Sequence, residues 1–98
     1  MSFETTKSGA RIAIVGVGQV GGATAYALIL KSIASELLLV DNNMTLRDGQ
    51  VRDLSDVAYN SNSSTRVRAA SYTEAGKCDI VIITAGSKHT LGKGRSKR

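Results

Sequence analysis

Three glycines with a fixed spacing form the pattern in this chain that is best suited to chemistry. The stretch from Gly16 to Gly21 has the form G-x-G-x-x-G and lies between an apolar run and a helical pattern. There Gly16 makes a tight turn, Gly18 leaves room for a pyrophosphate, and Gly21 lets helix and strand pack closely. Free N–H groups and the positive end of the helix dipole would hold the phosphates. The alternative is a glycine-rich turn that only packs tightly.

A carboxylate follows at the spacing that a bound dinucleotide requires. Asp41 ends the next apolar run, 20 residues after Gly21, where the adenosine ribose lies in such sites. A carboxylate accepts hydrogen bonds from both ribose hydroxyls and repels a 2′-phosphate, and no arginine follows directly. The two features together predict NAD rather than NADP. Without the glycines, Asp41 is equally suited to capping a helix.

The hydrophobic pattern supplies the strands and helices that must position these residues. Four short apolar runs predict strands, and two longer patterns between the first three runs predict helices. The expected strands are residues 11–15, 36–40, 65–69 and 79–84, and the expected helices are residues 19–31 and 45–59. The third strand alternates as at a sheet edge, and a short linker joins it to the fourth. This order predicts an α/β fold with a parallel sheet.

Length and composition limit the class of protein. The 98 residues suffice for one small domain, and 42% apolar with 21% charged residues is typical of globular chains. The net charge of +5 comes entirely from a tail, residues 88–98, because residues 1–87 hold eight basic and eight acidic side chains. The expected folded part therefore has no basic character that would indicate a nucleic-acid partner.

Membrane and metal functions find no support in the sequence. No apolar stretch approaches the roughly 18 residues of a transmembrane helix, and the polar N-terminal arm, residues 1–10, lacks the centre of a secretory signal. The single cysteine, Cys78, cannot form an internal disulfide and has no neighbours that suggest a metal site. These features predict a cytoplasmic protein.

The motifs in combination resemble the NAD-dependent L-lactate and malate dehydrogenases, and the lactate branch looks closer. The matching stretches are residues 16–21, 41, 49–56 and 83–86. The resemblance covers residues 11–95 and implies a Rossmann-type parallel sheet, of which residues 11–87 carry the first half plus the fourth strand. In the family two more parallel strands and a substrate-binding half follow, so we expect a truncated dinucleotide-binding domain.

The resemblance also implies individual roles around NAD. The positions that would cradle the pyrophosphate are Gly16, Gly18, Val20 and Gly21. Asp41 would bind the ribose, and Tyr72 matches a position on the adenine side, although a lone tyrosine in a linker is about as often mere packing. Gly86 and Ser87 fall where the family's backbone meets the nicotinamide half, beyond a strand end.

The basic tail, residues 88–98, aligns with the family's mobile active-site loop. His89 takes the position that sets substrate specificity, where lactate dehydrogenases usually have glutamine and malate dehydrogenases arginine. Arg95 would polarise the substrate carbonyl as the hydride arrives. Both residues are equally compatible with a solvated chain end. Lys93 and Gly94 depart from the family, which has an acidic residue and a serine or threonine there.

The implied function is the NAD-binding portion of an oxidoreductase that moves a hydride between NAD and a small 2-hydroxy or 2-oxo acid. The family's proton-transfer histidine and its partners lie outside this sequence, so we expect no activity from the chain alone. The bare edge of the apolar fourth strand predicts a homo-oligomer or a complementing chain. The alternative is a non-catalytic interaction module whose residues 93–98 bind an acidic partner; nucleic acid is disfavoured because the tail has no aromatic residue for stacking.

Overall fold

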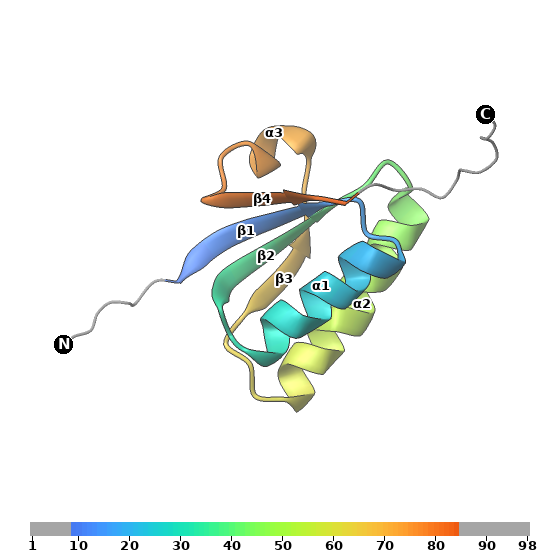
Figure 1. Cartoon of the computed structure of the whole chain (residues 1–98). Helices are drawn as coiled ribbons and strands as arrows, with labels where there is room; N and C mark the ends of the chain where they lie inside the picture. Colours follow the sequence, from blue (N-terminus) through green and yellow to red (C-terminus); the bar gives the residue numbers. More distant parts are fainter. Residues whose placement is uncertain (1–8, 85–98) are drawn as a thin grey trace.

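In the part of the chain that the structure describes, a four-stranded parallel sheet carries helices on both faces (Figure 1). The computed structural model describes residues 9–84. The strands are β1 (Ala10–Val15), β2 (Ala34–Val40), β3 (Arg66–Ala69) and β4 (Ile80–Ile83), and the helices are α1 (Gln19–Leu30), α2 (Met44–Asn60) and α3 (Tyr72–Ala75). In space the strands follow the order β3-β2-β1-β4, and every neighbouring pair is parallel. The predicted α/β, Rossmann-type sheet is confirmed.

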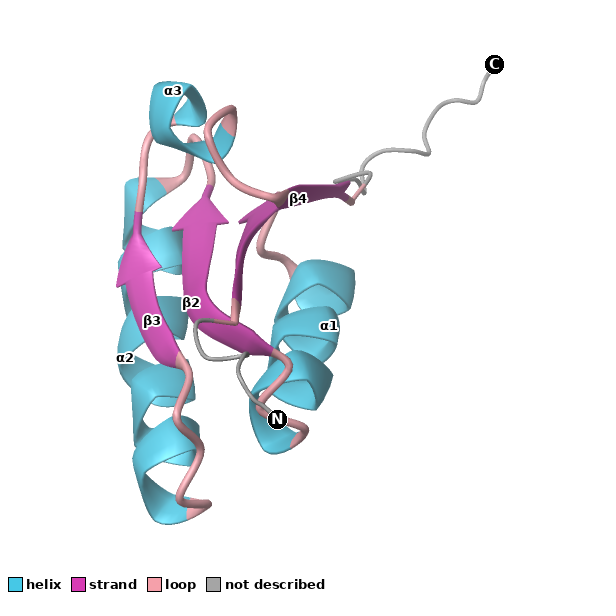
Figure 2. Cartoon of the chain, turned by 90° about the vertical axis from the view of Figure 1, so that its left-hand side faces the viewer, coloured by secondary structure: helices cyan, strands magenta, loops and turns pink. Residues whose placement is uncertain are grey.

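The strands end together at one edge of the sheet. Val15 of β1 pairs with Val40 of β2 and with Ile83 of β4, each the last residue of its strand. The arrows of β2 and β3 point the same way, toward the end at which α3 lies (Figure 2). The turns that follow the strands therefore gather at this carboxyl edge, the place where ligands bind in parallel α/β sheets.

One face of the sheet is closed by α1 and α2. Both helices lie along the same face of the sheet (Figure 1). Successive strand residues point to opposite faces, and one alternate set of strand side chains packs against these helices. The buried residues of this cluster are Ile12, Ile14, Val17, Ala25, Ile29, Ala34, Leu37, Leu39, Leu54 and Ala58. This helix-covered core fixes where each helix begins relative to the strand before it.

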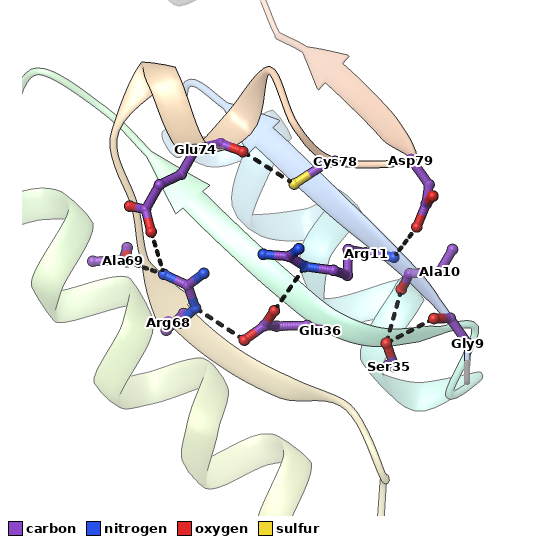
Figure 3. A network of polar contacts seen from close by, with 10 residues as sticks. All are labelled: Gly9, Ala10, Arg11, Ser35, Glu36, Arg68, Ala69, Glu74, Cys78 and Asp79. Carbon is purple, nitrogen blue, oxygen red and sulfur yellow. Dashed lines mark hydrogen bonds and ion pairs between the residues drawn. The ribbon is translucent and has the colours of Figure 1, made fainter. Parts of the chain in front are cut away.

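The opposite face carries a smaller apolar cluster beside α3 and a row of charges. The cluster consists of Ala13, Leu38, Val40, Ala70 and Ala75. Next to it, a polar network runs across the strands (Figure 3): Glu36 accepts from Arg11 at 3.0 Å and from Arg68 at 2.9 Å, and Arg68 also donates to Glu74 at 3.1 Å. The Arg68 guanidinium, helped by Arg11, lowers the pKa of Glu36 below its ordinary 4.5. This face thus combines apolar packing with ion pairs.

The structure corrects the predicted linker between the third and fourth strands. Residues 72–75 form the short helix α3, and its N-cap Ser71 and Glu74 make a reciprocal capping box. The Ser71 hydroxyl accepts from the Glu74 N–H at 3.1 Å, and the Glu74 carboxylate accepts from the Ser71 N–H at 3.0 Å. Serine followed three residues later by glutamate is the sequence signal for this cap, so the helix was predictable. The strand β2 also begins two residues earlier than expected, at Ala34.

Both edges of the sheet match the sequence expectations. The alternating strand β3 is an edge strand, and the apolar β4 forms the other edge. Within β4 the side chains of Ile80, Val81 and Ile83 are 47%, 41% and 76% exposed. The far edge of β4 is therefore bare in the described chain, as its apolar sequence led us to expect.

Candidate functional site

The loop from Gly16 to Gly21, called the glycine loop below, joins the end of β1 to the start of α1. Gly16 has φ +93°, a conformation that favours glycine, and its N–H donates to the Val40 carbonyl at 2.8 Å. A Cβ on Gly21 would overlap the Gly16 carbonyl oxygen. The tight turn expected of Gly16 and the close helix packing expected of Gly21 are therefore confirmed.

The middle of the loop is open. A Cβ built on Gly18 would meet no atom of residues 9–84 within 4 Å, so within this part of the chain the backbone is open to a ligand. The helix α1 begins directly after Gly18, and among the described residues no side chain caps its first N–H groups. Val20, in this first turn, is 65% exposed. An open backbone at a helix N-terminus with no acidic side chain in its first turn suits an anionic phosphate.

Asp41 touches the glycine loop from the end of β2. Its carboxylate accepts from the Val17 N–H at 2.9 Å through one oxygen and from the Asn43 N–H at 2.8 Å through the other. Capping of α2 is performed by Asn43, whose side chain accepts from the Leu46 N–H at 3.0 Å, so the alternative role of Asp41 as the helix cap is wrong. Carboxylate oxygens have further acceptor capacity, which leaves Asp41 able to receive hydroxyl donors.

Tyr72 lies at the same edge of the sheet, one strand further on. It is the first residue of α3, and its hydroxyl donates to the Asn42 side chain at 3.1 Å. Its side chain is 54% exposed, so the contact leaves much of the ring accessible. The structure therefore brings the glycine loop, Asp41 and Tyr72 together along the carboxyl edge.

Two further residues hold the glycine loop, and the sequence pattern assigned no role to either. The Thr84 hydroxyl, just after β4, donates to the Gly16 carbonyl at 2.8 Å. The Gln50 amide, on α2, donates to the Val17 carbonyl at 3.0 Å. Both belong to stretches that match the family pattern, but 68 residues separate Thr84 from Gly16 and 33 residues separate Gln50 from Val17. Contacts across such separations leave no periodic signal in a sequence.

The remaining predicted site residues, Gly86, Ser87, His89 and Arg95, lie outside the described residues, as does the whole basic tail. Between residues 9 and 84, no three or more His, Cys, Asp or Glu side chains are grouped so as to hold a metal ion. None of the helices in this range is both long and apolar enough to span a membrane.

Comparison with known proteins places this geometry in a family. Residues 10–97 match the family model described as the lactate/malate dehydrogenase, NAD binding domain. The chain is 51% identical over 87 residues to L-lactate dehydrogenase A of Rhizopus oryzae, covering 89% of this chain and 27% of that one. It is 42% identical over 85 residues to L-lactate dehydrogenase 3 of Bacillus cereus, covering 87% of this chain and 27% of the relative.

Solved structures give the same result. The minor L-lactate dehydrogenase of Enterococcus mundtii, in a ligands-bound form, superposes with a TM-score of 0.79 at 35% identity, covering 91% of this chain and 28% of that one. A Cryptosporidium parvum lactate dehydrogenase complexed with lactic acid and nicotinamide adenine dinucleotide gives a TM-score of 0.73 at 28% identity, covering 82% and 25%. The chain thus spans about 27% of the length of the curated relatives it matches. Its glycine loop, its parallel sheet and these matches show that the chain belongs to the lactate/malate dehydrogenase family, within the NAD-binding domain.

Proposed function

We propose that this chain binds NAD(H) at the carboxyl edge of its sheet, as a dinucleotide-binding unit over residues 11–87. The observation that carries the proposal is the contact between the Asp41 carboxylate and the open glycine loop, 2.9 Å from the Val17 nitrogen. This contact puts a carboxylate suited to ribose hydroxyls beside an open backbone suited to phosphate, and both are needed for one half of a dinucleotide.

Each part of the site has a role that its geometry suits. The backbone at Gly16, Gly18, Val20 and Gly21 holds the pyrophosphate. Asp41 accepts hydrogen bonds from the ribose hydroxyls, and its charge repels the 2′-phosphate of NADP. The exposed ring of Tyr72 is assigned to the adenine side. Gly86 and Ser87 lie outside the described residues, and the family resemblance alone assigns them to the nicotinamide half.

In the complete protein we expect hydride transfer between NAD and a small 2-hydroxy or 2-oxo acid. The support comes from the relatives, which are named L-lactate dehydrogenases, and from the neighbour solved with lactic acid and NAD. Bound NAD would supply the group that accepts or gives up the hydride. In this proposal Arg95 polarises the substrate carbonyl, and His89 contacts the substrate. The single thiol, Cys78, forms no disulfide and is compatible with a cytoplasmic location.

Calorimetric titration of the purified chain with NADH tests the cofactor proposal. We expect binding by the wild type, and a loss of at least about tenfold in Asp41→Asn, since hydrogen bonds to a charged group contribute roughly 1.5–3 kcal/mol. The neutral variant should also lose the preference for NADH over NADPH. Asp53→Asn, which removes an exposed carboxylate of α2, is the matched control. Failure of a folded wild-type chain to bind NADH would refute the proposal and favour the interaction module.

The chain alone should not turn over substrate. Catalysis needs a proton-transfer group and a fixed substrate as well as a cofactor. NADH absorbance in the presence of pyruvate or oxaloacetate should therefore follow the enzyme-free control. Consumption well above that control would contradict this part of the proposal.

The bare edge of β4 is proposed to pair with further polypeptide. In the assembled protein we expect the pairing polypeptide to be a strand that continues the sheet. In the isolated chain we expect it to be a second copy of this chain. The support is the apolar, uncharged sequence of β4 together with the exposure of Ile80, Val81 and Ile83, since bare edges of this kind pair with other chains. Light scattering over a range of concentrations should show a mass that rises above 10.3 kDa; a constant monomer mass would contradict it.

A further inference from the structure

The side chain of Gln50, on α2, contacts the glycine loop at Val17. Its side-chain amide donates to the Val17 carbonyl at 3.0 Å. The same amide lies against Gly22 of α1, where an added Cβ would stand 2.5 Å from the Gln50 nitrogen. The position of this amide therefore depends on the absence of a side chain at Gly22.

Val17, the residue that Gln50 contacts, is constrained by burial and by two hydrogen bonds. The Val17 side chain is 0% exposed, its N–H donates to Asp41 at 2.9 Å, and its carbonyl accepts from Gln50. A trans peptide is planar, and its N–H points opposite to its C=O. The N–H of Gly18 shares a peptide with the Val17 carbonyl, so the hydrogen bond from Gln50 turns the Gly18 N–H away from α2. Within residues 9–84 no backbone carbonyl accepts from that N–H.

We propose that Gln50 is a positioning residue for the cofactor, because it sets the direction in which the Gly18 N–H donates to the pyrophosphate. This inference rests on the proposed binding of NAD(H). The Val17 carbonyl is an acceptor, so the role requires a donor at position 50. An amide meets this requirement, whereas an ionised carboxylate does not.

The decisive variant is Gly22→Ala, because it moves Gln50 without removing it. The new methyl group displaces the far end of a flexible side chain, and alanine is the better helix former. We therefore expect the affinity for NADH to fall about fivefold, the value of one hydrogen bond, while the melting temperature stays the same or rises. Gly49→Ala is the matched control: its Cβ would lie an ordinary 3.7 Å from Arg52, and its affinity should not change.

Substitutions of Gln50 complete the test. Gln50→Leu and Gln50→Glu should each weaken NADH binding about fivefold or more, and adding Gly22→Ala to Gln50→Leu should cause no further loss, because both changes break the same contact. Wild-type affinity in Gly22→Ala and Gln50→Leu would overturn the inference, as would an affinity loss that only follows a lowered melting temperature. A folded wild-type chain that does not bind NADH would instead refute the proposed function.

Discussion

The two faces of the sheet are closed in different ways. The face toward α1 and α2 is covered by two long helices, and its side chains such as Ile14 and Leu39 are fully buried. The face toward α3 is covered only in part. It combines a small apolar cluster with the network of Arg11, Glu36 and Arg68, and it leaves Ile83 exposed.

This difference shows which parts of the domain are complete within the described residues. A helix-covered face depends on contacts that residues 9–84 provide themselves. The α3 face contains ion pairs that are partly exposed to water, and its last strand residue on β4, Ile83, is exposed. The first face therefore holds the fold and the glycine loop in place over β1 and β2. The second face and the edge strand β4, where Ile80 is 47% exposed on the first face and Ile83 is 76% exposed on the second, are where further polypeptide can pack.

The largest expected effect is a truncation in the helix-covered core. Leu39→Ala, at a fully buried position, should lower the free energy of unfolding by about 2–5 kcal/mol, since it leaves a cavity among rigid neighbours. Val81→Ala on the α3 face, at a 41% exposed position, should cost less than about 1 kcal/mol. Urea unfolding followed by circular dichroism measures both. Similar losses in the two variants would contradict the contrast between the faces.

A smaller, pH-dependent effect is expected in the polar network. Glu36→Gln should lower the free energy of unfolding by about 1 kcal/mol at pH 7, the scale of partly exposed ion pairs. The pKa of Glu36 is lowered mainly by the hydrogen bond from Arg68, so its contribution is present above the ordinary value of 4.5 and is lost as the pH falls through the folded-state pKa. Chemical unfolding at pH 7 and at pH 3.5 should show the difference from wild type shrinking. A difference that grows in acid would contradict the ion-pair role.

The smallest effect on stability is expected at the bare strand edge, where association changes instead. Ile83→Lys should alter the free energy of unfolding by no more than about 0.5 kcal/mol, because the side chain is 76% exposed. A charge on an edge strand opposes pairing, so light scattering should show less self-association. Tyr59→Lys, an equally apolar-to-charged change at an 84% exposed site on α2, is the control. Equal behaviour of the two variants would argue against pairing at β4.

Most of the fold could be predicted because its signals are local. The apolar runs at β1 and β2 and the spacing of the glycine loop are readable from neighbouring residues alone. The helix α3 has no periodic signal in the sequence, although its Ser71 and Glu74 carry a capping-box pattern. Four residues are too few to show helical periodicity, so the cap was the only available signal.

In the candidate site, too, some features can be predicted from the sequence and others are seen only in the tertiary structure. The residue types and order along the chain were enough to select the glycine loop, Asp41 and the family they indicate. Only the tertiary structure showed that Asp41 binds the Val17 N–H, that Asn43 rather than Asp41 caps α2, and that Gln50 holds the Val17 carbonyl. The reason is physical: strand and turn propensities depend on near neighbours, whereas these hydrogen bonds form only after parallel strands bring distant turns to one edge of the sheet.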